Sequence, residues 1–359
     1  MTTVATMIPH SRPAISQEDL QVTADVLRSG QIAQGPWVER FEREMAAFVG
    51  VRGGVAVSSG TAALELALRA LRIGMGDEVI MPSYVCAAPW LATQRVGGQA
   101  RLVDIDVNTF NIDPLAARRA ITKKTRAIIV PHLFGLPADL TALERLGIPL
   151  IEDCAQTLGV TEQGRRVGTV GRLTICSFYA TKILCAGEGG MVLSNEASLL
   201  ERISSLREYD GVAALDPSSF NLKLTDLQAA LGLSQLGRFS AFQGRRSFLA
   251  EAYRDTLSTK TAVCSIVPPG RTHGYYRFVI RLPHAQTASG GLANMISRLE
   301  QQGIHCRKPV FRPLHRYLDQ PGFPHSDEAD RTALSIPLYP DLTDDEVLQI
   351  QQSLVQVLS

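Results

Sequence analysis

From residue 53 to residue 195, the chain alternates short apolar runs with segments whose apolar side chains recur at helical spacing. Two of the helical segments are 62–72 and 140–146, and the apolar runs are candidate strands at 54–57, 78–81, 101–104, 127–131, 149–152, 173–177 and 190–194. Strands that are apolar throughout are typical of a mostly parallel sheet with helices on both faces. The sequence therefore predicts an α/β fold with a mostly parallel seven-stranded sheet between helices. Ligands of such sheets bind at the carboxyl ends of the strands.

The last third of the chain predicts a smaller α+β unit. We expect a strand at 276–282, a loop at 284–291, and helices at 225–239, 245–257, 292–301 and 344–358, with Thr225 as the N-cap of the first helix. A chain of 359 residues also exceeds the size that one hydrophobic core usually serves. We therefore predict a large domain at 1–245 and a small C-terminal domain at 246–359.

Composition and charge argue against several classes of partner. With 36 Lys and Arg against 35 Asp and Glu, the net charge of +1 gives no long-range attraction for nucleic acid or an anionic membrane. No segment approaches the roughly 20 apolar residues that span a bilayer, and residues 1–9 lack the regions of a signal peptide. The cysteines form no C-x-x-C pair and no zinc-like grouping, which favours reduced, buried thiols: Cys86, Cys154, Cys176, Cys185, Cys264 and Cys306. We expect a cytoplasmic protein without a metal site.

A strand, a turn of small residues and a helix follow one another around Ser58-Ser59-Gly60-Thr61. The N-terminus of a helix has unpaired N–H groups and a partial positive charge, which suit a phosphate. Gly60 would let the backbone come close to this phosphate, and Thr61 could add a hydroxyl. The same sequence is also typical of an ordinary helix cap, so this motif alone does not identify a phosphate site.

Two polar motifs follow later strands. One apolar run ends in Glu152 and Asp153, with Gln156 close behind. Such acids are usually solvated, but a carboxylate there could also keep a pyridinium nitrogen protonated. Lys182 lies between an apolar strand that ends in Ser177 and the Gly-rich turn 187–190. This lysine is either a surface charge or a desolvated amine that forms a Schiff base with a carbonyl cofactor.

In this order and spacing, the three motifs resemble the DegT/StrS family of sugar aminotransferases, which have the fold of aspartate aminotransferase (fold type I). The similarity covers nearly the whole chain. It also includes SGQIAQGP at 29–36, GDEVIMPS at 76–83, VDID at 103–106, PHLFG at 131–135, NLKLTDLQAA at 221–230 and LSIPLYP at 334–340. The resemblance implies an aminotransferase with pyridoxal 5′-phosphate as its cofactor.

The resemblance also implies roles for individual residues. Lys182 would form the Schiff base and later move a proton between the substrate and the cofactor, while Asp153 would pair with the pyridine nitrogen. Gln156 would lie close to the ring and its O3′ atom.

The phosphate site follows from the same resemblance. Gly60, Thr61 and Ser177 would hold the cofactor phosphate. Asn221 would reach the phosphate of the neighbouring subunit, which implies a homodimer with shared active sites.

The sequence departs from the family pattern at two places. The family usually has an aromatic residue that stacks on the cofactor ring where this chain has Cys86, although Tyr84 and Trp90 are nearby. Many members have a histidine where Val310 stands, in a loop that faces the sugar. In this chain the loop is cationic, which is compatible with either a phosphorylated or carboxylated substrate or a solvated basic loop: Arg307, Lys308, Arg312 and His315.

The expected reaction transfers an amino group from an amino acid, with L-glutamate as the expected donor, to a keto sugar. The resemblance favours a nucleotide-linked deoxyketohexose, and it leaves polysaccharide biosynthesis, secondary metabolites and modified antibiotic sugars open as destinations of the product. Two alternatives on the same fold are an aminotransferase for keto-cyclitols and a sugar dehydratase, although the dehydratase branch replaces the Schiff-base lysine with histidine. A regulator that binds the cofactor without turnover is a further alternative, against which the set of Lys182, Asp153 and Gln156 argues.

Overall fold

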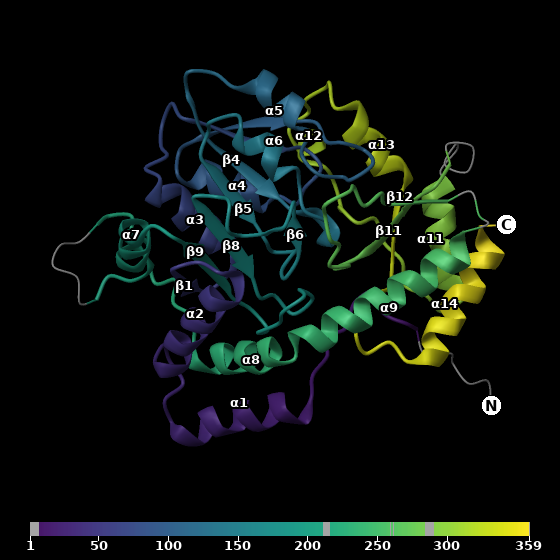
Figure 1. Ribbon diagram of the computed structural model, residues 1–359, viewed down its shortest axis with the longest axis horizontal. Coiled ribbons are helices and arrows are strands. Elements are labelled where there is room, and N and C mark those ends of the chain that lie inside the picture. Colours follow the sequence, from purple (N-terminus) through teal and green to yellow (C-terminus); the bar gives the residue numbers. More distant parts are fainter. Residues whose placement is uncertain (1–6, 211–215, 259, 261, 284–290, 359) are drawn as a thin grey trace.

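The computed structural model describes residues 7–210, 216–258, 260, 262–283 and 291–358 (Figure 1). Its helices are α1 (Gln17–Ser29), α2 (Pro36–Val49), α3 (Gly60–Ala70), α4 (Ala88–Arg95), α5 (Pro114–Ala120), the 3-10 turn η1 (Leu133–Gly135), α6 (Leu140–Glu144), α7 (Ala197–Arg207), α8 (Asp226–Gly237), α9 (Phe239–Leu257), α11 (Gly291–Gln301), α12 (Leu314–Tyr317), α13 (Pro324–Thr332) and α14 (Asp344–Val357). Its strands are β1 (Gly53–Val57), β2 (Glu78–Pro82), β3 (Gln99–Val103), β4 (Thr125–Pro131), β5 (Leu150–Asp153), β6 (Thr161–Glu162), β7 (Arg165–Arg166), β8 (Leu173–Ser177), β9 (Gly190–Ser194), β10 (Val263–Cys264), β11 (Phe278–Arg281) and β12 (Ala333–Ile336).

Seven strands form the large sheet, in the order β1-β9-β8-β5-β4-β2-β3. Strand β9 is antiparallel to both of its neighbours, and the other adjacent pairs are parallel. These strands coincide with the seven predicted runs to within two residues at each end. The predicted α/β fold with a mostly parallel sheet is therefore confirmed. Because β9 alone runs the other way, the carboxyl ends of the other six strands lie along one edge of the sheet.

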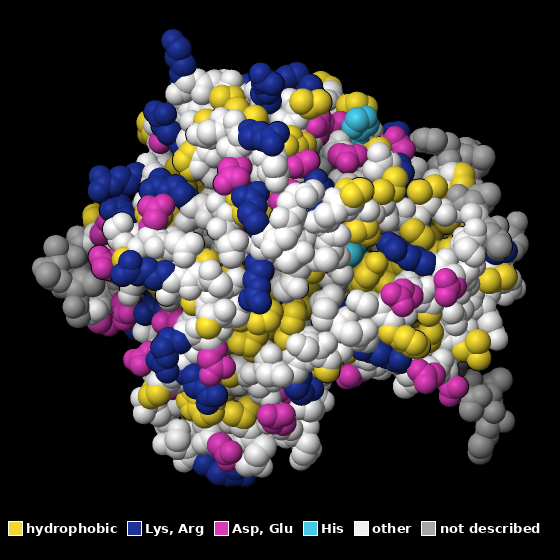
Figure 2. Space-filling model, viewed as in Figure 1, with side chains coloured by type: hydrophobic (Ala, Val, Ile, Leu, Met, Phe, Trp, Pro, Cys, Tyr) yellow, Lys and Arg dark blue, Asp and Glu magenta, His cyan; other side chains and the backbone are white. Residues whose placement is uncertain are grey.

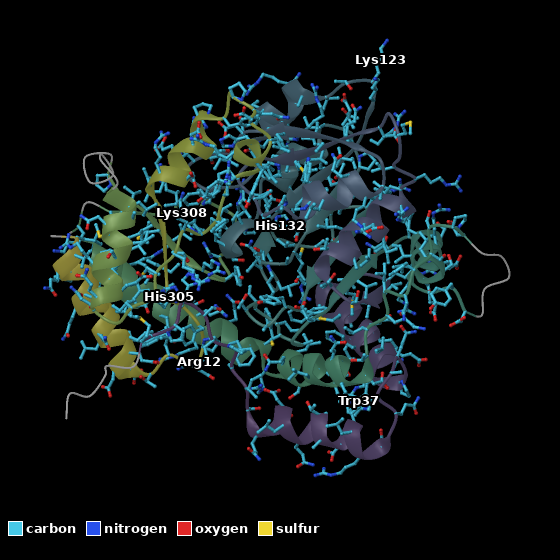
Figure 3. The ribbon with its side chains drawn as sticks, turned by 180° about the vertical axis from the view of Figure 1, so that it is seen from behind. Arg12, Trp37, Lys123, His132, His305 and Lys308 are labelled. Atoms are coloured by element: carbon cyan, nitrogen blue, oxygen red, sulfur yellow. The ribbon has the colours of Figure 1, made fainter. Side chains whose placement is uncertain are left out.

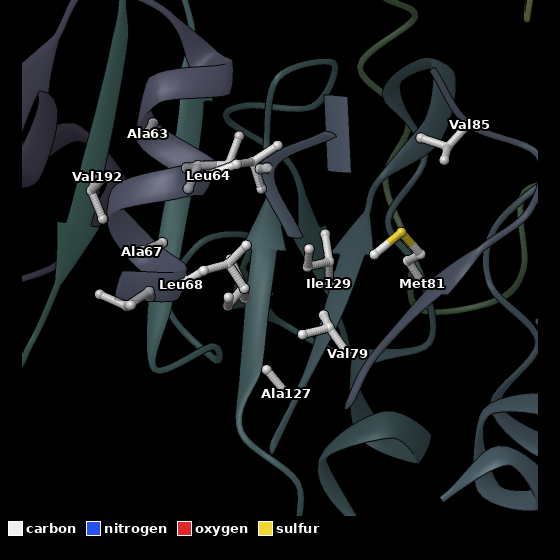
Figure 4. Close-up of a cluster of buried hydrophobic side chains, with 14 of the residues drawn as sticks. Ala63, Leu64, Ala67, Leu68, Val79, Met81, Val85, Ala127, Ile129 and Val192 are labelled. Atoms are coloured by element: carbon white, nitrogen blue, oxygen red, sulfur yellow. The ribbon is translucent and has the colours of Figure 1, made fainter. Parts of the chain in front are cut away.

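Helices cover both faces of this sheet, since most of its strands bury apolar side chains on both sides. On one face, Val79, Ile129 and Val192 share a core with Leu64 and Leu68 of α3 (Figure 4), and α4 and α7 complete this layer. On the other face, α2 and α8 pack over one half of the sheet, and α5 and α6 cover the other half. The sheet thus lies between two helical layers, and its carboxyl edge provides a rigid base for a site.

The boundary between α8 and α9 differs from the prediction. Thr225 is the N-cap of α8, as expected, and its hydroxyl accepts a hydrogen bond from a backbone N–H in the first turn. The backbone leaves helical geometry at Arg238 (φ −100°, ψ 4°), and α9 begins at Phe239 rather than at residue 245. Phe239, Phe242 and Leu249 are buried at helical spacing, which explains why the helix includes the residues that were predicted to connect two helices.

The C-terminal unit has its own core. An antiparallel sheet in the order β10-β11-β12 packs with α9, α11 and α14. Ile8 joins this core and pairs with Ile304, so residues near the start of the chain lie against the C-terminal unit. Residue 245 falls inside α9, and the division of the chain into domains at that position remains a proposal. The predicted loop at 284–291 lies outside the described residues except for Gly291, which begins α11.

The distribution of charged side chains on the surface is consistent with the nearly neutral net charge. On the face shown in Figure 2, basic and acidic side chains are interspersed. Among the described residues, no helix is both long and apolar enough to cross a membrane. Four of the six cysteines are buried, as predicted, whereas Cys264 is half-buried and Cys86 is exposed.

Candidate active site

The predicted site residues meet at the carboxyl edge of the large sheet. Gly60 begins α3 immediately after β1, Asp153 is the last residue of β5, and Ser177 is the last residue of β8. Lys182 follows in the segment between β8 and β9. Residues that are far apart in sequence are therefore brought together because β5 and β8 are neighbours, only β9 separates β8 from β1, and β1, β5 and β8 point the same way.

A small cradle lies where α3 begins. The Ser59 side chain caps this helix by accepting a hydrogen bond from the Ala62 N–H at 3.1 Å. A Cβ atom on Gly60 would come within 2.8 Å of the Ser177 Cβ, so a glycine is required for this turn to lie beside the serine. The half-buried Thr61 belongs to the first turn of the same helix. Two hydroxyl groups and a helix N-terminus with open backbone N–H groups suit a phosphate.

Gly190, the first residue of β9, keeps this cradle in place. A Cβ atom on Gly190 would come within 2.3 Å of the Ser59 carbonyl oxygen, which is closer than any side chain tolerates. Gly190 also pairs with Ser177 across the antiparallel ladder. The close approach of these backbones fixes the position of Ser177 relative to the first turn of α3.

Lys182 is half-buried in a tight loop. Its own backbone N–H donates to the Tyr179 carbonyl at 2.8 Å. Its Nζ atom lies 5.4 Å from the centre of the Tyr276 ring, which supports the amine from one side. The Lys182 charge also acts on Asp153 and on Cys86, so these three side chains share one local electrostatic environment.

Asp153 is buried, with 8% of its surface exposed. Its Oδ1 atom accepts a hydrogen bond from the Ala155 N–H at 3.0 Å. Burial raises the pKa of this carboxyl above its ordinary value, and the Ala155 N–H and the charge of Lys182 only partly oppose the effect. A cation placed against this carboxylate would therefore stabilise its ionised form.

A buried network that was not predicted supports Asp153. The backbone N–H of His132 donates to the backbone carbonyl of Asp153 at 3.1 Å. Nδ1 of His132 accepts the Ala138 N–H, so the proton is on Nε2, which donates to Oε2 of Glu152 at 3.1 Å. Figure 3 shows His132 in the interior of the molecule. The sequence motif PHLFG contains this histidine, but only the folded chain shows what it contacts.

Glu152 is fully buried and accepts three further hydrogen bonds, from the backbone N–H groups of Gly168, Val170 and Gly171. Burial alone would raise the pKa of Glu152, but the hydrogen bonds from His132 and from these N–H groups hold it below its ordinary value. His132, Glu152 and Cys154 have metal-ligating atoms within 4.8 Å of one another. Because both carboxylate oxygens are already used, we interpret this group as a structural network.

Gln156 is held by a backbone contact. Its Oε1 atom accepts the Phe134 N–H at 2.9 Å. This hydrogen bond identifies the side-chain oxygen and leaves the amide NH₂ group to donate elsewhere. Gln156 is half-buried just beyond β5, close to the end of the strand that carries Asp153.

Cys86 lies in the loop after β2, is exposed, and is close enough to Lys182 and Asp153 to interact with their charges. The protein around the thiol disfavours its ionised form and raises its pKa, although the Lys182 charge acts in the opposite direction. Tyr84 cannot replace the missing aromatic residue, because its ring is fully buried and stacks on Phe110 at 6.0 Å. Trp90 is half-buried and packs against the main core.

Tyr276 is a site residue that the motif analysis did not identify. Its ring is buried, and its hydroxyl accepts a hydrogen bond from Nη2 of Arg277 at 3.3 Å. Burial would raise the pKa of this phenol, but the charges of Lys182 and Arg277 and a hydrogen bond with Thr181 lower it to about 8. No local pattern marks this tyrosine, since its role depends on contact with a lysine that lies far away in the sequence.

Asn221 has an exposed side chain, and its Oδ1 atom accepts the Lys223 N–H at 3.5 Å. The neighbouring Leu222 carbonyl accepts the Ser58 N–H at 2.8 Å, so this segment runs beside the end of β1. The amide is thus available at the surface, and its contact with a second subunit remains a proposal.

The cationic loop after Cys306 differs from the expectation of four similar basic residues. His315 is buried, with 3% of its surface exposed, and it bonds Ser83 and Asp327. Lys308 forms an ion pair with Asp330. Val310 is buried in the main core rather than facing a ligand. Arg307 and Arg312 remain as the exposed cations of this loop.

Comparison with known proteins extends these observations. Residues 13–355 match the DegT/DnrJ/EryC1/StrS aminotransferase family. The spore coat polysaccharide biosynthesis protein SpsC of Bacillus subtilis (strain 168) is 33% identical over 95% of this chain and 94% of its own length. GDP-perosamine synthase of Vibrio cholerae is 31% identical over 96% of this chain and 97% of its own length.

The fold of this chain also superposes closely on a solved structure. The PMP-form of Spr1654 from Streptococcus pneumoniae superposes with a TM-score of 0.92 at 26% identity, and the match covers 98% of this chain and 97% of that one. The PLP-form of the same protein gives a TM-score of 0.90 at 25% identity. The family predicted from the sequence motifs is confirmed over nearly the whole length, and the chain belongs to the DegT/DnrJ/EryC1/StrS aminotransferase family.

Proposed function

We propose that this enzyme transfers an amino group from L-glutamate to the keto carbon of a nucleotide-linked deoxyketohexose. The protein is a sugar aminotransferase, and its cofactor is pyridoxal 5′-phosphate, in line with its family and with the PLP- and PMP-forms of Spr1654. The amino donor and the sugar acceptor are our own inference. The observation that carries the proposal is the meeting of the cradle, Asp153 and Lys182 at one edge of the sheet.

The residues at this edge fit the cofactor. The turn of Gly60 and Thr61, together with Ser177, would hold its phosphate, and the Asp153 carboxylate would pair with its ring nitrogen. Gln156 would lie near the ring, with its amide oriented by the Phe134 N–H. When bound, the protonated cofactor ring supplies an electron sink for charge that develops on the substrate carbon.

Lys182 would act at two points of the reaction. Its Nζ atom would hold the cofactor covalently and, once displaced by the substrate amine, would carry a proton to and from the reacting carbon. The Tyr276 ring on one side of Nζ would limit the positions that this amine can take. The raised pKa of Asp153 fits a carboxyl whose ionised form awaits a cationic partner.

The names of two relatives support the acceptor class. GDP-perosamine synthase is named for a nucleotide-linked sugar, and SpsC is named for spore coat polysaccharide biosynthesis. We therefore propose a nucleotide-linked acceptor and a place in polysaccharide biosynthesis for this chain. A lysine at position 182, rather than a histidine, favours amination over the dehydratase alternative.

The test is isotope transfer. The holoenzyme would be incubated with ¹⁵N-labelled L-glutamate and a panel of nucleotide-linked deoxyketohexoses, and products would be identified by mass spectrometry. We expect 2-oxoglutarate and an amino sugar that carries ¹⁵N. A dehydrated sugar without nitrogen would identify the dehydratase alternative, whereas label on a keto-cyclitol and on none of the sugars would identify a cyclitol aminotransferase.

We also propose a homodimer in which Asn221 of each subunit reaches the cofactor phosphate of the other. Its exposed amide supports this arrangement. Mixed dimers of a Lys182→Ala subunit and an Asn221→Ala subunit would then retain one intact site and recover activity. If both sites of the mixed dimer are impaired, Asn221 acts within its own subunit. If the Asn221→Ala homodimer keeps wild-type activity, Asn221 has no such role.

A further inference from the structure

A cavity of about 530 Å³ lies in the C-terminal unit. Four parts of the chain form its walls: the segment near His10, Arg277 just before β11, helix α11, and the segment that follows Ile304. Its polar lining consists of His10, Arg277, Glu300, His305, Arg307 and Lys308. In Figure 3, His305 and Lys308 mark this region of the C-terminal unit.

One aromatic ring joins this cavity to the catalytic lysine. The Arg277 guanidinium carbon lies 4.8 Å from the centre of the Tyr276 ring, and Nζ of Lys182 lies 5.4 Å from the same centre. Nη2 of Arg277 also donates to the Tyr276 hydroxyl. A ligand held by Arg277 would therefore lie next to the group that supports the catalytic amine.

The cavity has more positive than negative charge. Glu300 lies 3.9 Å from His305, and Lys308 pairs with Asp330. Across residues 7–210, 216–258, 260, 262–283 and 291–358, neither Arg277 nor Arg307 forms an ion pair with a carboxylate. No residue outside these ranges is Asp or Glu. Within the part of the chain that the structure describes, Glu300 is thus the one acidic side chain that lines the cavity, and it lies near His305 rather than in an ion pair with either guanidinium group.

The contacts of His10 confirm the local excess of positive charge. Nη1 of Arg277 lies 2.8 Å from Nδ1 and 3.0 Å from Nε2 of His10. Because Arg277 can only donate, one of these ring nitrogens accepts, and the ring is neutral. Nε2 of His10 lies 2.9 Å from the Ser335 hydroxyl, and Ser335 also pairs with Arg307 through the backbone. Burial and the charges of Arg277, Arg307 and His305 lower the pKa of His10 to about 2.

We propose that Arg277 and Arg307 form a binding site for an oxyanion of a substrate, either a phosphate of the sugar acceptor or a carboxylate of the amino donor. Guanidinium groups bind both anions through paired N–H donors. The cavity also has an apolar side that includes Phe311, whose side chain is 86% exposed. This inference deepens the proposed function and rests on it for the identity of the two substrates.

The test begins with a titration that needs no turnover. Inorganic pyrophosphate would be titrated into the wild-type holoenzyme and into Arg277→Lys, Arg277→Gln and Arg307→Gln variants by calorimetry. Arg307 is exposed, so its replacement should leave folding unchanged. The control is Arg298→Gln, on the exposed side of α11. Loss of one charge-assisted contact should weaken binding about 10-fold in the Gln variants and less in Arg277→Lys.

Half-reaction kinetics then distinguish the two sources of the anion. If the site holds the acceptor phosphate, pyrophosphate binding weakens and the donor half-reaction of Arg307→Gln with L-glutamate keeps its wild-type rate and KM. If the site holds the donor carboxylate, the KM for L-glutamate rises about 10-fold instead. Equal behaviour of Arg277→Gln, Arg307→Gln and Arg298→Gln in both measurements would overturn the proposal. Because calorimetry does not depend on transamination, failure of the proposed function alone would leave the pyrophosphate result interpretable.

Discussion

The Ser83 hydroxyl forms a hydrogen bond with Nδ1 of His315, although 232 residues separate them in the chain. Both side chains are buried, and Nε2 of the imidazole lies 2.9 Å from Oδ1 of Asp327. Ser83 directly follows β2, and His315 belongs to α12. This chain of contacts fastens the loop after Cys306 to the edge of the sheet where the site lies.

Replacing Ser83 with Ala should therefore affect both stability and the acceptor. The buried imidazole would lose a partner, at a cost of about 1–3 kcal/mol in the free energy of unfolding. The loosened loop should also raise the KM for the sugar more than the KM for L-glutamate. Urea denaturation and half-reaction kinetics measure these two effects. Ser240→Ala, on an exposed position of α9, is the matched control, and equal stability of the two variants would contradict the role of Ser83.

Replacing the buried Glu152 should lower the free energy of unfolding more than replacing most other carboxylates of this protein. In a Glu152→Gln variant, the new NH₂ group would face donors from His132 or from the backbone instead of accepting their hydrogen bonds. We expect a loss of at least about 3 kcal/mol in the free energy of unfolding. Glu144→Gln, which breaks a surface ion pair with Arg165, should cost less than about 1 kcal/mol. A small and equal cost for both variants would be inconsistent with this network.

The raised pKa of Asp153 predicts how the stability of the cofactor-free protein depends on pH. A raised carboxyl pKa means that the folded state binds more protons than the unfolded chain, so the contribution of Asp153 is full below its ordinary value of 3.8 and is lost as pH rises through the raised pKa. The Asp153→Asn variant should thus unfold at a higher temperature than the wild type at pH 7.

This gain should shrink as the pH falls toward 4, and it should disappear when the wild type binds the cofactor. Thermal melts of both proteins, with and without the cofactor, measure the difference. A cofactor-free variant that is less stable than the wild type at pH 7 would show that Asp153 is satisfied without a cationic partner.

We expect an aromatic residue in place of Cys86 to tighten binding of the cofactor. A Cys86→Phe variant would place an aromatic ring at the exposed position beside Lys182 and Asp153. Stacking on the cofactor ring should tighten its binding by about 0.5–1.5 kcal/mol. Equilibrium dialysis of the cofactor measures this effect, with Cys86→Ser as the variant that lacks a ring. Unchanged or weaker binding by the Phe variant would mean that residue 86 does not lie over the cofactor.

The sequence predicted most of the large sheet because its strands are locally apolar. It did not lead us to helices α1 and α2, even though Ser16 and Asp19 form a capping box and Pro36 occupies a favoured first position. Helix α9 was predicted too short for a related reason. Arg238 interrupts the helical geometry without a proline or an αL glycine to mark the junction, so the pattern of residues 225–257 could be divided in more than one way.

The roles of the predicted site residues remain predictions, but part of their placement in the fold followed from the sequence. Asp153 and Ser177 lie at strand ends, Lys182 follows Ser177 in the segment before β9, and the order of strands brings such residues together. His132, Tyr276 and the contact of Ser83 with His315 were not predicted, because each depends on partners distant in the sequence. His315 in particular was expected in a cationic loop, and only the folded chain shows that Asp327 and Ser83 enclose it.

The most direct test of the account is the visible absorption spectrum of the protein with pyridoxal phosphate, before and after addition of L-glutamate. We predict a band from cofactor bound to a lysine in the wild type and in Lys123→Ala, an exposed control labelled in Figure 3, and no such band in Lys182→Ala. Glutamate should replace this band with that of pyridoxamine phosphate. A lysine-bound band that persists in Lys182→Ala, or its absence from the wild type, would contradict the central claim.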